Sequence, residues 1–294
     1  MGQKTSDVVC LVEAGAAVGE SPVWVAEEKA LYWIDIHGPA LYRYDPATGD
    51  NRSWALDEPI GSFALRQGGG VIAALRSGFA FIDLTTGEVE HLHDPEPRKP
   101  GNRLNDGRCD RRGRFWAGSM AEDMQSRDGA LYRFGPDRSC HAMVSDIAVS
   151  NGLAWSPDNK TMYHTDSPQR TVWAWDFDID TGAVCNRRVF AEAARGEGYP
   201  DGAAIDEEGC YWSARWNGGR LVRHASDGRV IETVMMPVRK PTMCAFGGDR
   251  LDILYVTSAT QGMTAEQRRA EPQAGGLFAL EIGVRGLPEP RFAG

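Results

Sequence analysis

The chain has 294 residues, 42% of them hydrophobic and 25% charged, which is the balance of a globular protein with a large core. No apolar run approaches the ~20 residues that a membrane-spanning helix needs, so we expect no membrane partner. The formal net charge of -9 argues against nucleic acid as a partner, because phosphate backbones are bound by basic surfaces. A small solute or a metal ion is more compatible with this charge.

The N-terminal residues 1–7 contain no apolar h-region, so no secretory signal is indicated and we expect a cytoplasmic protein. They match the short myristoylation pattern at Gly2 and Ser6, but no polybasic cluster follows to give a second membrane anchor. The six cysteines include no Cys-x-x-Cys pair, which excludes a zinc knuckle and a redox motif of that type.

A pair of aromatic, β-rich runs separated by a turn recurs along the chain. The six copies are 30–36 with 41–45, 71–75 with 79–83, 114–118 with 131–134, 161–165 with 172–176, 210–214 with 220–223, and 253–257 with 276–280. Taken at Tyr32, Val71, Phe115, Met162, Tyr211 and Leu254, the copies are 39 to 49 residues apart. Two such runs form a hairpin, and most of the tryptophans in them are expected to pack between blades.

A period of this length predicts one four-stranded blade per copy. We therefore expect an all-β protein, a six-bladed β-propeller of four-stranded antiparallel blades around a central channel, with residues 1–294 in a single domain. A β-sandwich fits less well, because sandwiches show no such regular aromatic repeat. Helix is expected only in short pieces such as 264–269.

Four polar segments precede the repeats, at 19–24, 102–107, 150–155 and 198–206. Segments that lead into the innermost strands converge at one mouth of a propeller, so we expect Glu20, Asn105, Asn151 and Asp201 to meet there. Asp201 stands between Pro200, which fixes its own φ, and a glycine that can turn. We expect it at a strand entrance, presented by a turn.

Two carboxylates and one or two amide oxygens, without thiol or imidazole, form a hard site that suits Ca²⁺, Mg²⁺ or Mn²⁺. Each residue alone also fits a simpler role. Asn151 before Gly152 is typical of a turn, and Glu20 of a solvated loop acid. We interpret His164 and Asp166 as part of the strand structure. We expect Trp216 at the rim of the pocket.

Together the four segments resemble the SMP-30/gluconolactonase/regucalcin family, and the likeness extends to 244–248 and 274–278. The resemblance implies one divalent metal ion, Ca²⁺, Mg²⁺, Mn²⁺ or Zn²⁺, with ligands that match Glu20, Asn151 and Asp201. It implies substrate contacts at positions that match Arg103, Asn105 and Glu122.

The same resemblance implies hydrolysis of sugar lactones, such as pentono- or hexono-lactones, to aldonic acids. Asp201 is then the catalytic residue, either as the general base or as a ligand that orients water, because a carboxylate bound to a cation is a weaker base. Two alternatives stay open: another metal-dependent hydrolase of the esterase or phosphotriesterase type, and a calcium-binding regulator without catalysis. We expect a monomer with a small-molecule sugar lactone as its partner.

Overall fold

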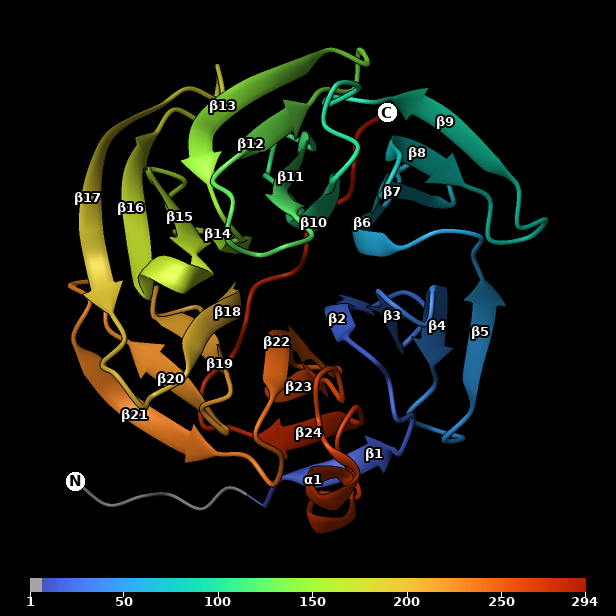
Figure 1. Cartoon of the computed structure of the whole chain (residues 1–294), viewed down its shortest axis with the longest axis vertical. Helices are drawn as coiled ribbons and strands as arrows, with labels where there is room; N and C mark the ends of the chain where they lie inside the picture. The colour runs from blue at the N-terminus through green and yellow to red at the C-terminus, as the bar shows by residue number, and fades with distance from the viewer. Residues whose placement is uncertain (1–6) are drawn as a thin grey trace.

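The computed structural model describes residues 7–294, so the myristoylation pattern at Gly2 and Ser6 lies outside the described residues. Six four-stranded antiparallel sheets are arranged as blades in a ring (Figure 1). The predicted all-β, six-bladed propeller is therefore confirmed.

All six aromatic pairs form the two middle strands of a blade, as the repeat predicts. The second strands are β3 (Ala30–Asp35), β7 (Val71–Leu75), β11 (Phe115–Ala121), β15 (Thr161–Asp166), β19 (Tyr211–Trp216) and β23 (Ile253–Ser258). The third strands are β4 (Ala40–Tyr44), β8 (Gly78–Ile82), β12 (Gly129–Phe134), β16 (Thr171–Phe177), β20 (Arg220–His224) and β24 (Leu277–Glu281).

Burial decreases from the centre of the ring outwards. The innermost strands, almost wholly buried, are β2 (Gly19–Val25), β6 (Ile60–Leu65), β10 (Asn102–Cys109), β14 (Ser150–Trp155), β18 (Tyr199–Ile205) and β22 (Pro241–Gly247). The outermost strands, mostly solvent-facing, are β5 (Asn51–Ala55), β9 (Val89–His93), β13 (Cys140–Ile147), β17 (Val184–Glu192), β21 (Val230–Met235) and β1 (Val9–Val12). Strands buried on both faces tolerate polar side chains only where these have a partner or a function.

The ring is closed by pairing strands from opposite ends of the sequence. In the last blade the order is β22, β23, β24 and β1, so an N-terminal strand completes a sheet that is otherwise C-terminal. Val9 lies opposite Ala279 in this pairing. Both segments are needed to finish the sixth blade.

The apolar core consists of six clusters, one between each pair of neighbouring blades. Between the third and fourth blades, Trp116 packs against Trp155 and Phe177, with ring centroids 5.8 and 6.0 Å apart. Trp33, Trp116 and Trp212 have no exposed surface. The expected role of the tryptophans in blade packing is thus confirmed for these residues.

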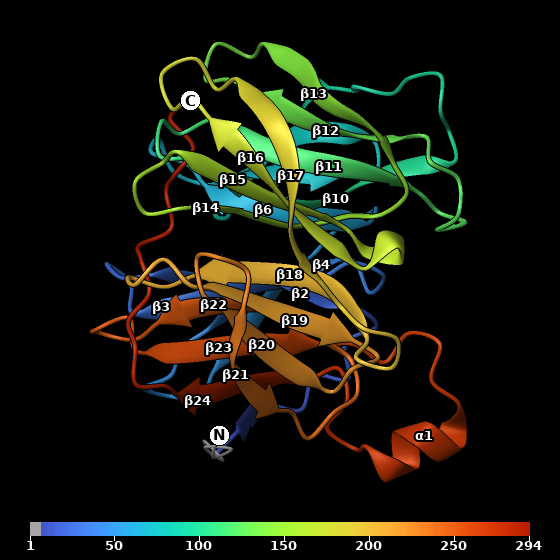
Figure 2. The same cartoon turned by 90° about the vertical axis from the view of Figure 1, so that its left-hand side faces the viewer.

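The C-terminal strap, residues 285–294, crosses one end of the ring (Figure 2). Its backbone forms hydrogen bonds with the backbone of four blades. The partners are Leu65 in the second blade, Gly113 in the third, Glu207 in the fifth and Leu251 in the sixth. The hydrogen bonds range from 2.7 to 3.0 Å. The strap therefore covers this end of the central axis and links the second and fifth blades, which are not neighbours in the ring.

The helices are short and lie towards the other end of the ring. They are a 3₁₀ turn η1 (Ser167–Gln169) and α1 (Ala265–Ala270), which begins at a capping box between Thr264 and Gln267. The predicted helical piece at 264–269 is confirmed. No helix among residues 7–294 is long and apolar enough to cross a bilayer.

Candidate functional site

The innermost strands share an irregularity at corresponding positions. Register shifts fall between Glu20 and Val23 in β2, Leu104 and Gly107 in β10, Asn151 and Ala154 in β14, and Pro200 and Ala203 in β18. A bulge places two residues opposite one and re-aims side chains. All four polar residues expected at the channel mouth lie in or beside these bulges, so strands rather than loops position them.

The expectation that Asp201 stands at a strand entrance is wrong. β18 begins at Tyr199, and Asp201 is its third residue. Gly202 is not in a left-handed conformation; a Cβ there would lie 2.4 Å from Cγ of Met243 on the neighbouring β22. The glycine is required by close contact between two innermost strands, and the bulge performs the role that we assigned to a turn.

A cavity of about 340 Å³ is walled in part by Ser167 and Pro168 of η1 and by no residue of the C-terminal strap, so it lies at the other end of the ring. Five of the six predicted site residues line this mouth cavity: Glu20, Arg103, Asn105, Asn151 and Asp201. Its remaining walls come from Val18, Ile36, Met120, Met124, Val149, Ser167, Pro168, Tyr199, Trp216 and Gln261. The expected place of Trp216 beside the pocket agrees with this lining.

Glu122 is the predicted site residue that does not line the mouth cavity. Its side chain is 42% exposed and forms an ion pair of 3.3 Å with Arg76. Its charge still acts on Arg103, whose pKa it raises against the larger lowering by burial. Glu122 therefore lies close enough to influence the guanidinium of Arg103 without closing the cavity.

A chain of hydrogen bonds joins the site residues across three blades. Nη1 of Arg103 donates to Oδ1 of Asn105 at 2.7 Å, and Nδ2 of Asn105 donates to Oδ1 of Asn151 at 3.0 Å. Nδ2 of Asn151 donates to Oγ of Ser167 at 2.8 Å, and that hydroxyl donates to the carbonyl of Pro200 at 2.6 Å. Both amide side chains are thereby oriented, and the Oδ1 of Asn151 keeps a free lone pair.

The carboxylates of the site are close together and poorly neutralised. Burial raises the pKa of Glu20 well above its usual value, and the carboxylates of Asp201 and Asp106 raise it further. Burial also raises the pKa of Asp201, with the charge of Asp106 as the next cause. Arg103 acts in the opposite direction on both groups, but it forms no ion pair with a carboxylate among the described residues. The site favours an added positive charge.

Asp106 does not line the mouth cavity, but its charge acts on Glu20 and Asp201, and the sequence pattern did not reveal this to us. It is buried, and its Oδ2 accepts a hydrogen bond from the backbone of Leu153 at 3.1 Å, while Oδ1 has no partner. Burial raises its pKa, and the charge of Arg108 lowers it. A signal was present, because an acid directly after Asn105 in an innermost strand must be buried.

The donor set fits a hard divalent cation. Two buried carboxylates, Glu20 and Asp201, share the mouth cavity with the oriented amide oxygen of Asn151, and such oxygens are ligands of Ca²⁺, Mg²⁺ and Mn²⁺. Within residues 7–294, no three His, Cys, Asp or Glu side chains form a group suited to a metal. An amide ligand would therefore be needed beside the two carboxylates.

His164 and Asp166 serve the strand structure, as interpreted from the sequence. His164 is buried and its Nε2 is 2.8 Å from Oγ of Ser150, while burial lowers its pKa to about 4. The Oδ1 of Asp166 accepts the backbone N–H of Val149 at 3.0 Å. Neither residue lines the mouth cavity.

Residues 18–260 match the model of the SMP-30/gluconolactonase/LRE-like region. The chain belongs to this family. It is 42% identical over 286 residues to the 6-deoxy-6-sulfogluconolactonase of Pseudomonas putida, covering 97% of this chain and 98% of the relative. It is 39% identical to the regucalcin of Xenopus laevis, with 98% of each chain covered.

A solved structure in this family is closely similar. The calcium-binding protein regucalcin of Agrobacterium tumefaciens superposes with a TM-score of 0.95 at 28% identity, covering 99% of both chains. The family inferred from the motifs and the fold predicted from the repeat are thereby confirmed.

Proposed function

We propose that this protein hydrolyses aldonolactones to aldonic acids with the help of one divalent cation. The observation that carries the proposal is the meeting of Glu20, Asn151 and Asp201 with Arg103 in one mouth cavity. Membership of a family that includes a sulfogluconolactonase supports the same reaction class. All of these groups come from one chain, and we propose a monomer with the site in a single domain.

Glu20, Asn151 and Asp201 would hold the cation. When bound, the cation supplies Lewis-acid polarisation of the lactone carbonyl and lowers the pKa of nearby water. Its positive charge would favour the ionised form of both carboxylates, whose pKa values burial and neighbouring acids raise in its absence. Asn105 keeps the amide of Asn151 in the orientation that presents its oxygen.

Arg103 would bind the substrate. Nη1 is engaged by Asn105 and by the carbonyl of Leu104, which leaves Nε and Nη2 to donate to ring, carbonyl or hydroxyl oxygens. Burial lowers its pKa to about 10, so it stays charged at neutral pH. Glu122 would act from the rim through its effect on Arg103.

Asp201 is our catalytic residue. Its buried carboxylate lines the mouth cavity together with Arg103, and it would accept a proton from the attacking water. Because cation binding weakens a carboxylate as a base, orientation of that water is the second contribution of this side chain. Removing a general base slows such reactions by about 10²–10⁴-fold.

Acid release from a panel of lactones tests the proposal. The panel contains pentono- and hexono-lactones and 6-deoxy-6-sulfogluconolactone, the substrate in the name of the Pseudomonas putida relative. Enzyme stripped of metal should be inactive and should recover with Ca²⁺, Mg²⁺, Mn²⁺ or Zn²⁺. Asp201→Asn should lose at least about 100-fold in kcat. The matched control is Asp249→Asn, whose carboxylate is 71% exposed and pairs with Lys29.

Undiminished turnover by Asp201→Asn would overturn the proposed mechanism. Tight calcium binding without any lactone hydrolysis would favour the calcium-binding regulator instead. Hydrolysis of phosphotriesters or simple esters with sugar lactones left intact would favour the other type of metal-dependent hydrolase.

A further inference from the structure

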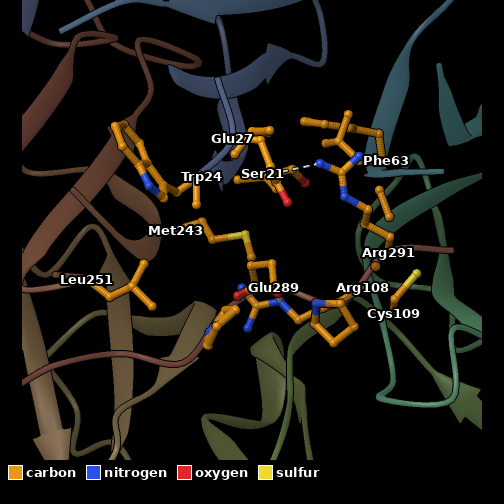
Figure 3. A pocket seen from close by; sticks show the side chains of 18 of the residues that line it. Ser21, Trp24, Glu27, Phe63, Arg108, Cys109, Met243, Leu251, Glu289 and Arg291 are labelled. Atoms are coloured by element: carbon orange, nitrogen blue, oxygen red, sulfur yellow. Dashed lines mark hydrogen bonds and ion pairs between the residues drawn. The ribbon is translucent and has the colours of Figure 1, made fainter. Parts of the chain in front are cut away.

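A second cavity, of about 220 Å³, lies under the C-terminal strap. We call it the strap cavity. Its walls include Ser21 and Trp24 from β2, Arg108 from β10, and Glu289 from the strap (Figure 3). Glu20 and Ser21 are adjacent in sequence, yet one lines the mouth cavity and the other the strap cavity. The strap cavity is therefore separate from the site described above.

Unpaired hydrogen-bond donors are concentrated around the strap cavity. Oγ of Ser21, Nε1 of Trp24 and Nη2 of Arg108 are buried and have no partner. Their residues are 1%, 8% and 9% exposed. Buried polar groups in native proteins are nearly always bonded to protein, water or a ligand, so three such groups around one cavity call for an occupant. All three groups can donate, which favours an occupant rich in acceptors.

The charges around the strap cavity favour an anion. Glu27 pairs with Arg291 at 3.0 Å, and Asp249 with Lys29 at 3.0 Å, so these two acids already have cationic partners. Arg108 forms an ion pair with Glu289, 3.3 Å between Nε and Oε2, and its charge lowers the pKa of the buried Asp106, but its Nη2 is unused. An arginine fork with a free N–H is suited to a second carboxylate.

We propose that the strap cavity is a second binding site, for a small carboxylate held by Arg108, Ser21 and Trp24. The carboxylate of Glu289, carried by the strap, approaches Arg108 from one side. A bound carboxylate would compete with Glu289 for the guanidinium. The Arg108–Glu289 ion pair and ligand binding are therefore linked, so removing the ion pair should raise the affinity for the carboxylate.

Calorimetric titration with sodium gluconate at constant ionic strength tests the site, with sodium chloride as the reference. Wild type should bind, and Arg108→Gln should bind at least about tenfold more weakly, the loss expected for a charge-assisted hydrogen bond. Glu289→Gln should bind several-fold more tightly, because the competing carboxylate is gone. Arg285→Gln, which changes an exposed strap charge that does not line the cavity, should bind as wild type does.

Two further variants distinguish binding in the strap cavity from binding in the mouth cavity and from a purely structural role of Glu289. Arg103→Gln alters the mouth cavity and leaves the strap cavity intact. If Arg103→Gln loses gluconate binding while Arg108→Gln keeps it, gluconate binds in the mouth cavity and the proposal is overturned. The double variant Arg108→Gln with Glu289→Gln removes both charges of this pair together, and it should fold and fail to bind gluconate. If Arg108 and Glu289 form only a structural contact, Glu289→Gln will lower the unfolding temperature without raising gluconate affinity, and that result also overturns the proposal.

Discussion

Nδ2 of Asn105 donates to Oδ1 of Asn151 at 3.0 Å, so this hydrogen bond joins side chains of the innermost strands of the third and fourth blades in the mouth cavity. The same Asn105 accepts from Arg103, which makes it the link between the proposed substrate contact and the proposed metal ligands. Asn105 can therefore influence the affinity for the cation without contacting the cation itself.

Replacing Asn105 by Ala should weaken metal binding and catalysis together. The amide of Asn151 loses a partner that orients it. Mutating the hydrogen-bond partner of a metal ligand typically lowers metal affinity or activity by about 10–100-fold. Arg103 loses one of its two hydrogen-bond partners at the same time and keeps the carbonyl of Leu104, so KM should also rise. Titration with metal and steady-state kinetics measure the two effects. An unchanged metal affinity would show that Asn151 is held by Ser167 alone.

Metal binding should release protons at pH values where ordinary carboxylates are already ionised. Glu20 and Asp201 have raised pKa values in the metal-free protein, so part of the pair is protonated where ordinary carboxylates are ionised. Affinity for the cation should therefore fall as the pH is lowered through the raised pKa values. Calorimetry in two buffers of different ionisation enthalpy counts the protons. Equal heats in both buffers at every pH above the ordinary carboxylate range would contradict this expectation.

Glu20→Gln should stabilise the metal-free protein while it abolishes stabilisation by metal. A carboxyl whose pKa is raised in the fold contributes stability below its unfolded pKa and loses that contribution as the pH rises through the folded pKa. Glutamine does not ionise, so its advantage should grow with pH and reach at least about 2 °C in Tm. The exposed Glu281→Gln is the control, in thermal scans with EDTA and with added cation.

Phe292→Ala should unfold the strap end of the molecule more readily. Phe292 is completely buried, with its ring 5.9 Å from that of Phe81 and 6.1 Å from that of Phe134. Removing a buried phenylalanine costs about 3–5 kcal/mol. Urea denaturation should show this loss, and Phe292→Leu should show a smaller one. A loss below about 1 kcal/mol would mean that the strap contributes little to stability.

The architecture was predictable because it repeats. Each blade uses the same aromatic pair for its middle strands, and six copies of a weak pattern are stronger evidence than one clear motif. The innermost strand of the second blade, β6, offered no polar motif that could be read from the sequence. Gly61 stands where other blades carry polar side chains, and a Cβ on this residue would lie only 2.4 Å from the carbonyl oxygen of Leu104. That blade contributes packing to the site and no ligand.

The sequence predicted which residues form the site better than it predicted the backbone geometry that holds them. Glu20, Asn105, Asn151 and Asp201 were expected together from their places ahead of the repeats, and they line one cavity. Their strand bulges were not foreseen, since a bulge depends on pairing across two strands and leaves no local sequence pattern. The placement of Glu122 outside the cavity likewise depends on contacts between segments distant in sequence, whereas Asp106 could have been found from its position next to Asn105.

The pairing of β1 with β24 has a consequence for synthesis of the protein. A ribosome delivers β1 among the first strands and β24 as the last, so the first five blades can assemble on the emerging chain while β1 waits without its partner. The ring-closing step then resembles a loop closure over nearly the whole sequence, which is slow in comparison with hairpin formation. Circular permutation that links the end of the strap to β1 through a flexible linker and opens the chain in the turn between β5 and β6 would place β1 after β24 in the sequence, and it should accelerate refolding.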